Sequence, residues 1–307
     1  MTVYIVTTTI NQPTLATRKF ANISLNRGYK FIVVGDKKTP HEAYENMDGV
    51  YYLHPDIQDK KYKQVSDSIG WNNIQRRNLG FIEAYNEGAD IIATVDDDNI
   101  PYDTWGKNLY INKEVECDFY NHSSGFFDPL SVTQHNQVWH RGYPIEHVPN
   151  RLNYEYKGKK YFAPLIQADL WDGDPDIDAM ARLALKPIVK FSDSLKPFSS
   201  NNFSPFNSQN TFLSRKVLPY YFVLPHVGRM DDIWGAYIVQ HYFPNSVIYN
   251  QATVYQDRNE QDLIKNLENE IFGYRTTLKL LEDISNWRKY LPEQTLRFVD
   301  LYQKELK

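Results

Sequence analysis

The chain has 307 residues and a formal net charge of -4, with 42% apolar and 23% charged residues. These values are ordinary for a globular protein, and the negative charge argues against a protein that coats nucleic acid. The mean hydropathy is -0.57, and no run approaches the roughly 18 apolar residues that a membrane-spanning helix needs.

The first hundred residues alternate short apolar runs with amphipathic stretches. The apolar, β-branched runs predict four buried strands, at residues 3–6, 31–34, 50–53 and 91–95. Apolar residues at helical spacing predict two helices, at residues 14–26 and 71–86. Gly28 and Gly88 follow these helices as stop signals. The alternation predicts an α/β fold with a mostly parallel sheet flanked by helices.

The rest of the chain is less regular. Residues 101–207 are rich in loops and aromatic residues and give no clear strand pattern. From Asp257 the sequence becomes charged and helical, and a last helix is expected from about Pro292. One apolar stripe of this region is formed by Leu263, Leu267, Ile271 and Tyr274. We therefore expect one domain over residues 1–255, followed by a helical C-terminal extension over residues 256–307.

Polar residues follow three of the predicted strands. They are Thr7-Thr8-Thr9, Gly35-Asp36 and Asp96-Asp97-Asp98. In a parallel sheet the carboxyl ends of the strands meet at one edge, and ligands bind outside that edge. The sequence therefore predicts a binding site built from these three segments.

The carboxylate run carries the most specific chemistry. Asp96 and Asp98 are alternate residues after a strand, so both can face one side and hold Mg²⁺ or Mn²⁺. A cation there would stabilise the charge that a diphosphate gains as it leaves a nucleotide-diphosphate donor. The alternative is an Asp-rich cap of a helix beginning near Tyr102, with Pro101 in its first turn. Because a cap needs only one such residue, we favour the metal site.

The helix before this strand contains Arg76, Arg77 and Gly80. A basic side chain here would face a diphosphate or a uracil carbonyl, and the alternative is a solvated helix face. Since this helix and the carboxylate run form one helix-strand unit, we favour a functional role and choose Arg76 as the phosphate ligand.

Three downstream stretches carry a family resemblance: "VWHRGYPIEHV", "GDPDIDAMARL" and "NSQNTFLSRKVLPYYFVLPHVGRMDDIWGAYIVQ". Together with the preceding helix and Asp-Asp-Asp strand end, they resemble, in the same order, the blocks of the STELLO family. These are plant Golgi proteins with a glycosyltransferase-like domain of the GT-A type. The resemblance covers residues 76–240. A more distant likeness links the Asp-Asp-Asp strand end to plant UDP-arabinopyranose mutases.

The resemblance implies a GT-A, Rossmann-like fold. It implies a nucleotide-binding half in residues 1–100 and a donor-sugar and acceptor half in residues 101–255. The sequence departs from the family at His140, where Pro is usual, and at Gly235, where Arg is usual. The plant members also carry a membrane anchor, and they are known for supporting the assembly of cellulose synthase.

The resemblance also suggests site residues in the downstream blocks. Asp174 would accept hydrogen bonds from donor-sugar hydroxyls, with a purely structural turn as the alternative. In inverting GT-A enzymes a carboxylate of the "GRMDDIW" block takes the proton of the acceptor hydroxyl, so Asp231 and then Asp232 are the candidate bases. Asp232 is also a candidate cap for a helix beginning at Ile233. Arg229 would contact the diphosphate or orient these carboxylates.

The remaining candidates complete a donor site. Thr7, Thr8 and Asp36 would help to hold the base and ribose, and Asp97 is counted with the donor-binding residues. His226 and His241 are candidate third metal ligands, because glycosyltransferases often place a late histidine on the metal. The alternative for each histidine is a packed or surface side chain.

Together these features predict a metal-dependent, inverting glycosyltransferase that uses Mn²⁺ or Mg²⁺ and a nucleotide-diphosphate sugar, expected to be a UDP-sugar. The acceptor is left open among a glycan, a lipid-linked sugar, a protein and a modified nucleic-acid base. For the last, residues 156–161, "YKGKKY", offer a local basic patch. The alternatives are a nucleotide-sugar mutase and a non-catalytic binding or scaffold protein with the same fold.

The cysteine content and the amino end bear on the compartment. The single cysteine, Cys117, allows no disulfide within the chain and gives no zinc-ligand spacing. The amino end lacks the basic start and long apolar run of a signal peptide. We therefore expect a cytoplasmic protein.

Overall fold

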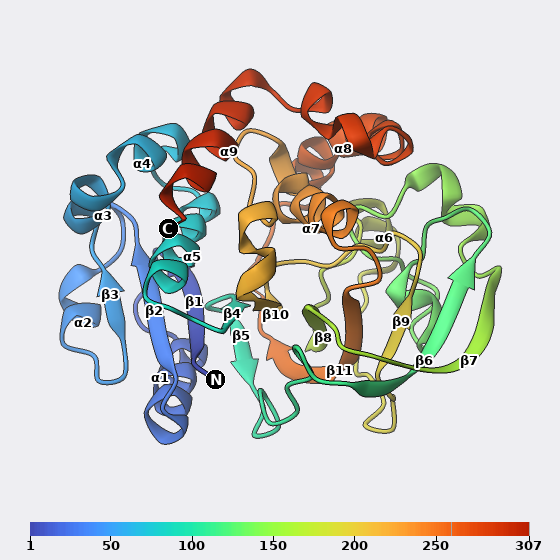
Figure 1. Cartoon of the computed structure of the whole chain (residues 1–307), viewed down its shortest axis with the longest axis horizontal. Coiled ribbons are helices and arrows are strands. Elements are labelled where there is room, and N and C mark those ends of the chain that lie inside the picture. Colours follow the sequence, from blue (N-terminus) through green and yellow to red (C-terminus); the bar gives the residue numbers. More distant parts are fainter. Residues whose placement is uncertain (259, 307) are drawn as a thin grey trace.

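The computed structural model describes residues 1–258 and 260–306, and a single mixed sheet runs through them (Figure 1). The strands are β1 Val3–Thr9, β2 Lys30–Gly35, β3 Tyr51–Leu53, β4 Ile91–Val95, β5 Asn99–Pro101, β6 Val115–His122, β7 Tyr154–Phe162, β8 Ile166–Gly173, β9 Phe198–Ser200, β10 Asn210–Ser214 and β11 Val247–Gln256. The helices are α1 Leu15–Arg27, α2 His41–Glu45, α3 Pro55–Lys61, α4 Lys63–Ile69, α5 Arg77–Asn86, α6 Ala179–Leu185, α7 Asp231–Tyr242, α8 Leu263–Glu282 and α9 Glu293–Glu305.

The order of the strands brings several strand ends to one edge. The order is β3-β2-β1-β4-β10-β8-β11-β9-β6-β7, and β5 pairs with β11. Strands β3, β2, β1 and β4 are parallel. Because β10 is antiparallel to both β4 and β8, β8 runs in the direction of β4, and β11 is parallel to β8. The carboxyl ends of β1, β2, β4, β8 and β11 therefore share an edge with the amino end of β10.

This architecture confirms the predicted α/β class. The sheet is parallel over its first four strands and mixed beyond β4. The strands predicted from the apolar runs are β1 to β4, and the first predicted helix is α1, with Thr14 as its N-cap and Gly28 at φ 66° after it. The sequence pattern did not reveal β6 and β7, because most of the side chains of β7 are exposed and carry no buried stripe.

Both faces of the sheet are covered, which explains the continuous apolar runs of its central strands. Alternate residues of β1 point to opposite faces. Tyr4 and Val6 join a core formed with α5, α7 and α9, whereas Val3 and Ile5 join a core formed with α1 and Trp105. Figure 1 shows α7 and α9 on one side of the sheet and α1 on the other.

The helix expected at residues 71–86 begins later. A 3₁₀ turn at Ile74–Arg76 precedes α5, which starts at Arg77. The cause is local, because Asn72 has a positive φ of 60° and Asn73 is extended. Residues 71–73 therefore cannot continue a helix toward the amino end.

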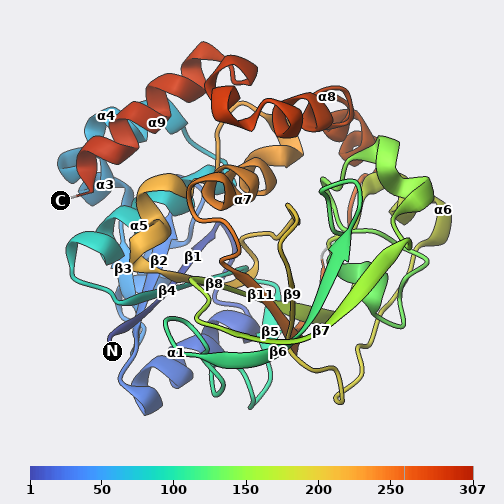
Figure 2. The same cartoon turned by 45° about the vertical axis from the view of Figure 1, so that its right-hand side comes forward.

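The C-terminal region is helical, as predicted, and packs on the side of the sheet that carries α7 (Figure 2). The expected apolar stripe of α8 is wrong in detail, because Ile271 is 40% exposed. The buried positions of α8 are instead Glu270, Gly273, Thr277, Leu280 and Leu281. Within the described residues, no helix combines the length and the apolar character that crossing a membrane requires.

Candidate functional site

A cavity of about 500 Å³ opens at the edge where the strand ends meet. Its walls carry charged side chains of both signs, from segments far apart in the sequence. The carboxylates are Asp96, Asp97, Asp98, Asp176, Asp231 and Asp232, and the guanidinium groups are Arg77, Arg141, Arg229 and Arg258. Polar residues thus meet at this edge, as predicted, and many of the side chains that line the cavity there are charged.

The three carboxylates after β4 have different surroundings. Asp96 accepts a hydrogen bond from Nη2 of Arg77. Asp97 turns toward the loop after β1, where Thr9 Oγ1 and Asn11 Nδ2 donate to its Oδ2 atom. Asp98 is different, because its buried Oδ1 atom has no hydrogen-bond partner among the described residues. No helix begins near Tyr102, and β5 follows instead, so the run does not act as a helix cap.

Asp98 is the carboxylate whose environment best fits a cation. Burial, together with the neighbouring charge of Asp96, raises its pKa to about 7. A divalent cation would compensate both the buried charge and the oxygen that lacks a partner. Among the described residues no group of three or more His, Cys, Asp or Glu side chains is arranged to hold a metal. A cation held by Asp98 would therefore need further ligands from outside these side chains.

Arg77 occupies the place expected for Arg76. Arg76 is buried away from the cavity, where it donates to Oε1 of Gln58 and to the carbonyl of Gly70. Its guanidinium carbon lies 3.4 Å from the ring centroid of Trp71. Consecutive helical residues point about 100° apart, so only one of the two arginines can face the cavity. The structure therefore does not support Arg76 as a direct phosphate ligand.

In the loop after β8, Asp176 lines the cavity and Asp174 does not. Asp174 instead forms an ion pair with Arg182. Asp176 accepts from Nε of Arg141 at 3.0 Å and from Nη2 of Arg141 at 2.7 Å. Although burial acts to raise the pKa of Asp176, the charges of Arg141, Arg258 and Arg229 hold it well below its usual range. Asp176 is thus a fixed anion that anchors cavity arginines.

The two carboxylates at the start of α7 differ in how firmly they are held. Asp232 accepts from the backbone N–H of Ser208 at 2.8 Å and from Nη2 of Arg141 at 3.0 Å. Asp231 accepts from Nε2 of Gln75 at 2.8 Å, and its Oδ1 lies 3.8 Å from Nη1 of Arg141. Burial and the charge of Asp232 raise the pKa of Asp231 to about 7. Because α7 begins at Asp231, Asp232 is not the cap that the sequence suggested.

The candidates for base and ribose binding divide between the cavity and its surroundings. Thr8 lines the cavity and donates from its Oγ1 to the carbonyl of Val34 at 3.0 Å. Thr7 is buried and lies outside the cavity wall. Asp36 is also buried, and its carboxylate accepts from the backbone N–H groups of Lys37 and Asn73. Of these three, only Thr8 reaches the cavity directly.

Neither candidate histidine reaches the cavity. His226 lies in the loop before α7 with φ 67°, and its Nε2 is 3.3 Å from the carbonyl of Ser68. Helix α7 is twelve residues long, and His241 lies in its last turn. The His241 ring contacts the Tyr242 ring edge-on. The cavity is at the opposite, amino end of α7, which begins with Asp231. The structure therefore gives no support to either residue as a metal ligand.

Sequence reasoning missed several residues that line the cavity. Arg141 lies in the quoted "VWHRGYP" stretch, so the resemblance held the signal that could have found it. Arg258 follows the carboxyl end of β11, and the strand-end rule would have found it had β11 been recognised. Gln209 belongs to the quoted "NSQNT" stretch and donates to Oε1 of Gln256 at 2.7 Å.

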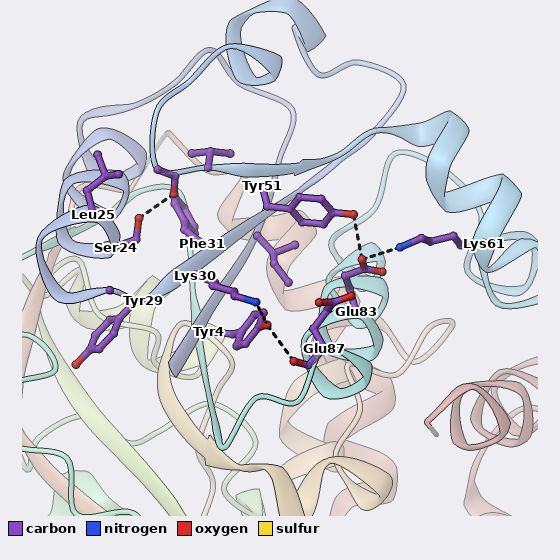
Figure 3. Close-up of a pocket in the computed structure, with 14 residues that line it drawn as sticks. Tyr4, Ser24, Leu25, Tyr29, Lys30, Phe31, Tyr51, Lys61, Glu83 and Glu87 are labelled. Carbon is purple, nitrogen blue, oxygen red and sulfur yellow. Dashed lines mark hydrogen bonds and ion pairs between the residues drawn. The ribbon is translucent and has the colours of Figure 1, made fainter. Parts of the chain in front are cut away.

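A second, larger cavity of about 610 Å³ lies at the opposite edge, beside the amino ends of β1, β2 and β3 (Figure 3). Several of its polar groups are paired with one another. Lys30 donates to the Tyr4 hydroxyl at 2.7 Å, and Glu83 accepts from Lys61 at 2.8 Å and from Tyr51 at 3.0 Å. Because Lys61 and Glu83 already pair and this cavity lacks the carboxylate run, we place the functional site at the first cavity.

Comparison with known proteins supports the resemblance noted above. No family model matches the chain. The Arabidopsis thaliana protein "Probable glycosyltransferase STELLO1" is 24% identical over 206 residues, which is 62% of this chain and 25% of that protein. "Probable glycosyltransferase STELLO2", from the same plant, is 22% identical over 170 residues, 50% of this chain and 21% of that protein. The chain is thus similar to the STELLO proteins over part of its length. It spans about a quarter of the length of these relatives.

Among solved structures, the chain overlaps glucosyl-3-phosphoglycerate synthase from Mycobacterium tuberculosis in complex with Mn²⁺, uridine diphosphate and phosphoglyceric acid. The TM-score is 0.47 at 12% identity, over 90% of this chain and 78% of that one. The same enzyme in complex with Mg²⁺ and uridine diphosphate gives a TM-score of 0.45 at 12% identity, over 90% and 79% of the two chains.

Proposed function

We propose that this STELLO-like chain is a metal-dependent glycosyltransferase that moves a sugar from a UDP-sugar to an acceptor hydroxyl with inversion. One observation carries the proposal. The cavity at the strand ends joins a carboxylate run, a group of guanidinium cations and a separate carboxylate with a raised pKa. Resemblance to proteins named probable glycosyltransferases supports the same reading.

In this proposal the donor diphosphate lies between the carboxylate run and the arginines. Asp96 and Asp98 would hold Mn²⁺ or Mg²⁺, and Arg229 and Arg258 would contact phosphate oxygens. When bound, the cation would offset the negative charge that collects on the departing diphosphate. Thr8 stands at the end of β1, on the side where the ribose and base would lie.

Asp231 is the proposed general base. A base works best when its pKa lies near the working pH, and burial beside Asp232 raises the pKa of Asp231 to about 7. Asp232 is less suited, because Ser208 and Arg141 already hold its two oxygens. Asp231 would accept the proton of the acceptor hydroxyl as that oxygen attacks the anomeric carbon.

The test measures thermal unfolding of the wild type and Asp98→Asn with a panel of nucleotide sugars, with and without Mn²⁺. A ligand at about 100 times its dissociation constant adds about 2.7 kcal/mol to the stability of the folded state. We expect a metal-dependent shift for a UDP-sugar that Asp98→Asn removes. The exposed Asp103 supplies the control Asp103→Asn, which should keep the shift.

The absence of a shift for every donor would overturn the proposal. Product analysis with the donor alone separates two reactions. Isomerised donor sugar would indicate a mutase, whereas an unchanged donor that is consumed only with added acceptor supports transfer.

A further inference from the structure

Helix α8, in the C-terminal extension, forms part of the cavity wall. Gln261, just before α8, and Asn269, within it, both line the cavity. The helix approaches the 3₁₀ turn Gly228–Met230 very closely. A Cβ atom on Gly228, which has φ 63°, would lie 2.5 Å from the carbonyl oxygen of Asn269. Position 228 therefore tolerates no side chain, and α8 packs closely against the segment that carries Arg229.

Glu270 of α8 contacts Arg229, a residue of the cavity wall. The Glu270 side chain is wholly buried. Oε1 accepts from Nε of Arg229 at 2.8 Å, and Oε2 accepts from the backbone N–H of Ala179 at 2.9 Å and from the Tyr274 hydroxyl at 3.0 Å. The carboxylate is therefore hydrogen-bonded through both oxygens, and Arg229 is the cation that it contacts directly.

Arg229 is held from two sides. While Nε faces Glu270, Nη2 lies 3.4 Å from Oδ1 of Asp176. The backbone carbonyl of Arg229 also accepts from Nη1 of Arg141. A flexible arginine loses considerable conformational entropy when it is fixed by a ligand, and two anchoring carboxylates remove that cost in advance.

We propose that Glu270 is a positioning residue that fixes the Arg229 guanidinium at the cavity wall, so that helix α8 completes the donor site. The identity of the bound group, a diphosphate, rests on the function proposed above. The fixing of Arg229 by Glu270 does not, and it can be measured by itself. Glu270 itself does not line the cavity and acts through Arg229, which does.

The experiment uses four variants of the full chain: Glu270→Gln, Arg229→Gln, the double variant and Glu268→Gln. Glu268 is an exposed carboxylate on the same helix and serves as the matched control. Calorimetry measures the affinity for UDP in the presence of Mn²⁺. The ¹⁵N–¹H spectrum of arginine Nε–Hε groups reports the environment of Arg229, whose signal is identified by its loss in Arg229→Gln.

We expect Glu270→Gln to weaken UDP binding about tenfold, and to add nothing in the Arg229→Gln background, because coupled residues are not additive. Glu268→Gln should bind like the wild type. Wild-type affinity in Glu270→Gln, or full additivity in the double variant, would overturn the proposal.

The spectrum separates failure of this inference from failure of the proposed function. If the wild type binds no UDP, the proposed function fails, and the Arg229 signal still decides the positioning role. The positioning role is supported if the Arg229 signal shifts in Glu270→Gln and stays in place in Glu268→Gln. An Arg229 signal that is unchanged in Glu270→Gln refutes it. If Glu270→Gln does not fold, Arg229→Lys takes its place. Lysine keeps a positive charge but lacks the Nε donor that Glu270 binds. We therefore expect Arg229→Lys to weaken UDP binding about tenfold, as expected for Glu270→Gln.

Discussion

Arg77 and Asp96 form an ion pair that joins the start of α5 to the end of β4, with the arginine side chain only 1% exposed. The same guanidinium donates to the carbonyl and the hydroxyl of Ser208, each at 2.8 Å. One buried arginine therefore connects the start of α5, the end of β4 and the segment around Ser208 beside the cavity.

Replacing Arg77 should destabilise the fold. In Arg77→Gln the Asp96 charge loses its ion-pair partner, while the Ser208 carbonyl keeps the hydrogen bond from Thr94 Oγ1. Removing one partner of a buried pair costs about 3–5 kcal/mol, and because Asp96 is 23% exposed we expect a loss at the lower end of that range. Urea unfolding should show a loss of that size. The exposed Arg18 gives the control Arg18→Gln, expected within about 0.5 kcal/mol of the wild type. A loss below about 1 kcal/mol in Arg77→Gln would contradict the structural role.

Replacing Asp231, the proposed base, should slow the reaction with little change in donor binding. In Asp231→Asn we expect kcat to fall about 10²–10⁴-fold, the usual contribution of general base catalysis. The wild-type rate should increase with pH up to about 7, because Asp231 must lose its proton to act and its pKa is raised to about 7. Initial rates over a pH series test this. A wild-type pH profile in the variant would exclude Asp231.

Asp169 should make stability depend on pH. It is buried, and burial raises its pKa to about 7. The folded state then binds this proton more tightly than the unfolded state, whose aspartate pKa is about 3.9. The contribution of Asp169 to stability is therefore full below about pH 4 and is lost as the pH rises through about 7.

Asp169→Asn should remove that loss. The difference in free energy of unfolding, Asp169→Asn minus wild type, should increase by up to about 4 kcal/mol between about pH 4 and pH 7. Urea midpoints measured across this range test the prediction. The exposed control Asp103→Asn should follow the wild-type curve. Parallel curves for Asp169→Asn and the wild type would show that the buried carboxyl does not titrate as stated.

Gly235 should tolerate no side chain. A Cβ atom at this position in α7 would overlap the backbone carbonyl of Phe222, which cannot move aside easily. Gly235→Ala should therefore cost about 1–3 kcal/mol. At Gly273 the atoms nearest to a Cβ atom belong to the flexible Met230 side chain and not to the backbone, so Gly273→Ala should cost less. Equal losses in thermal unfolding would contradict this difference.

The sequence by itself determined the local elements. The run Ile91–Val95 is β4, and the apolar pattern located it because every residue of this central strand is buried. The strand-end rule then gathered Thr8 and the carboxylates after β4 at one cavity, since parallel strands end at a shared edge.

Only the tertiary structure decided which side chains meet in that cavity. It selected Arg77 over Arg76, and Asp176 over Asp174, and it added Arg141. Residues close together in the sequence share composition and local pattern, but one lines the cavity and the other is held elsewhere, Arg76 by Gln58 and Asp174 by Arg182. That choice depends on the antiparallel β10 between β4 and β8, and on the packing of α8 against Gly228. Contacts between such distant segments arise when the sheet assembles, and local periodicity does not encode them.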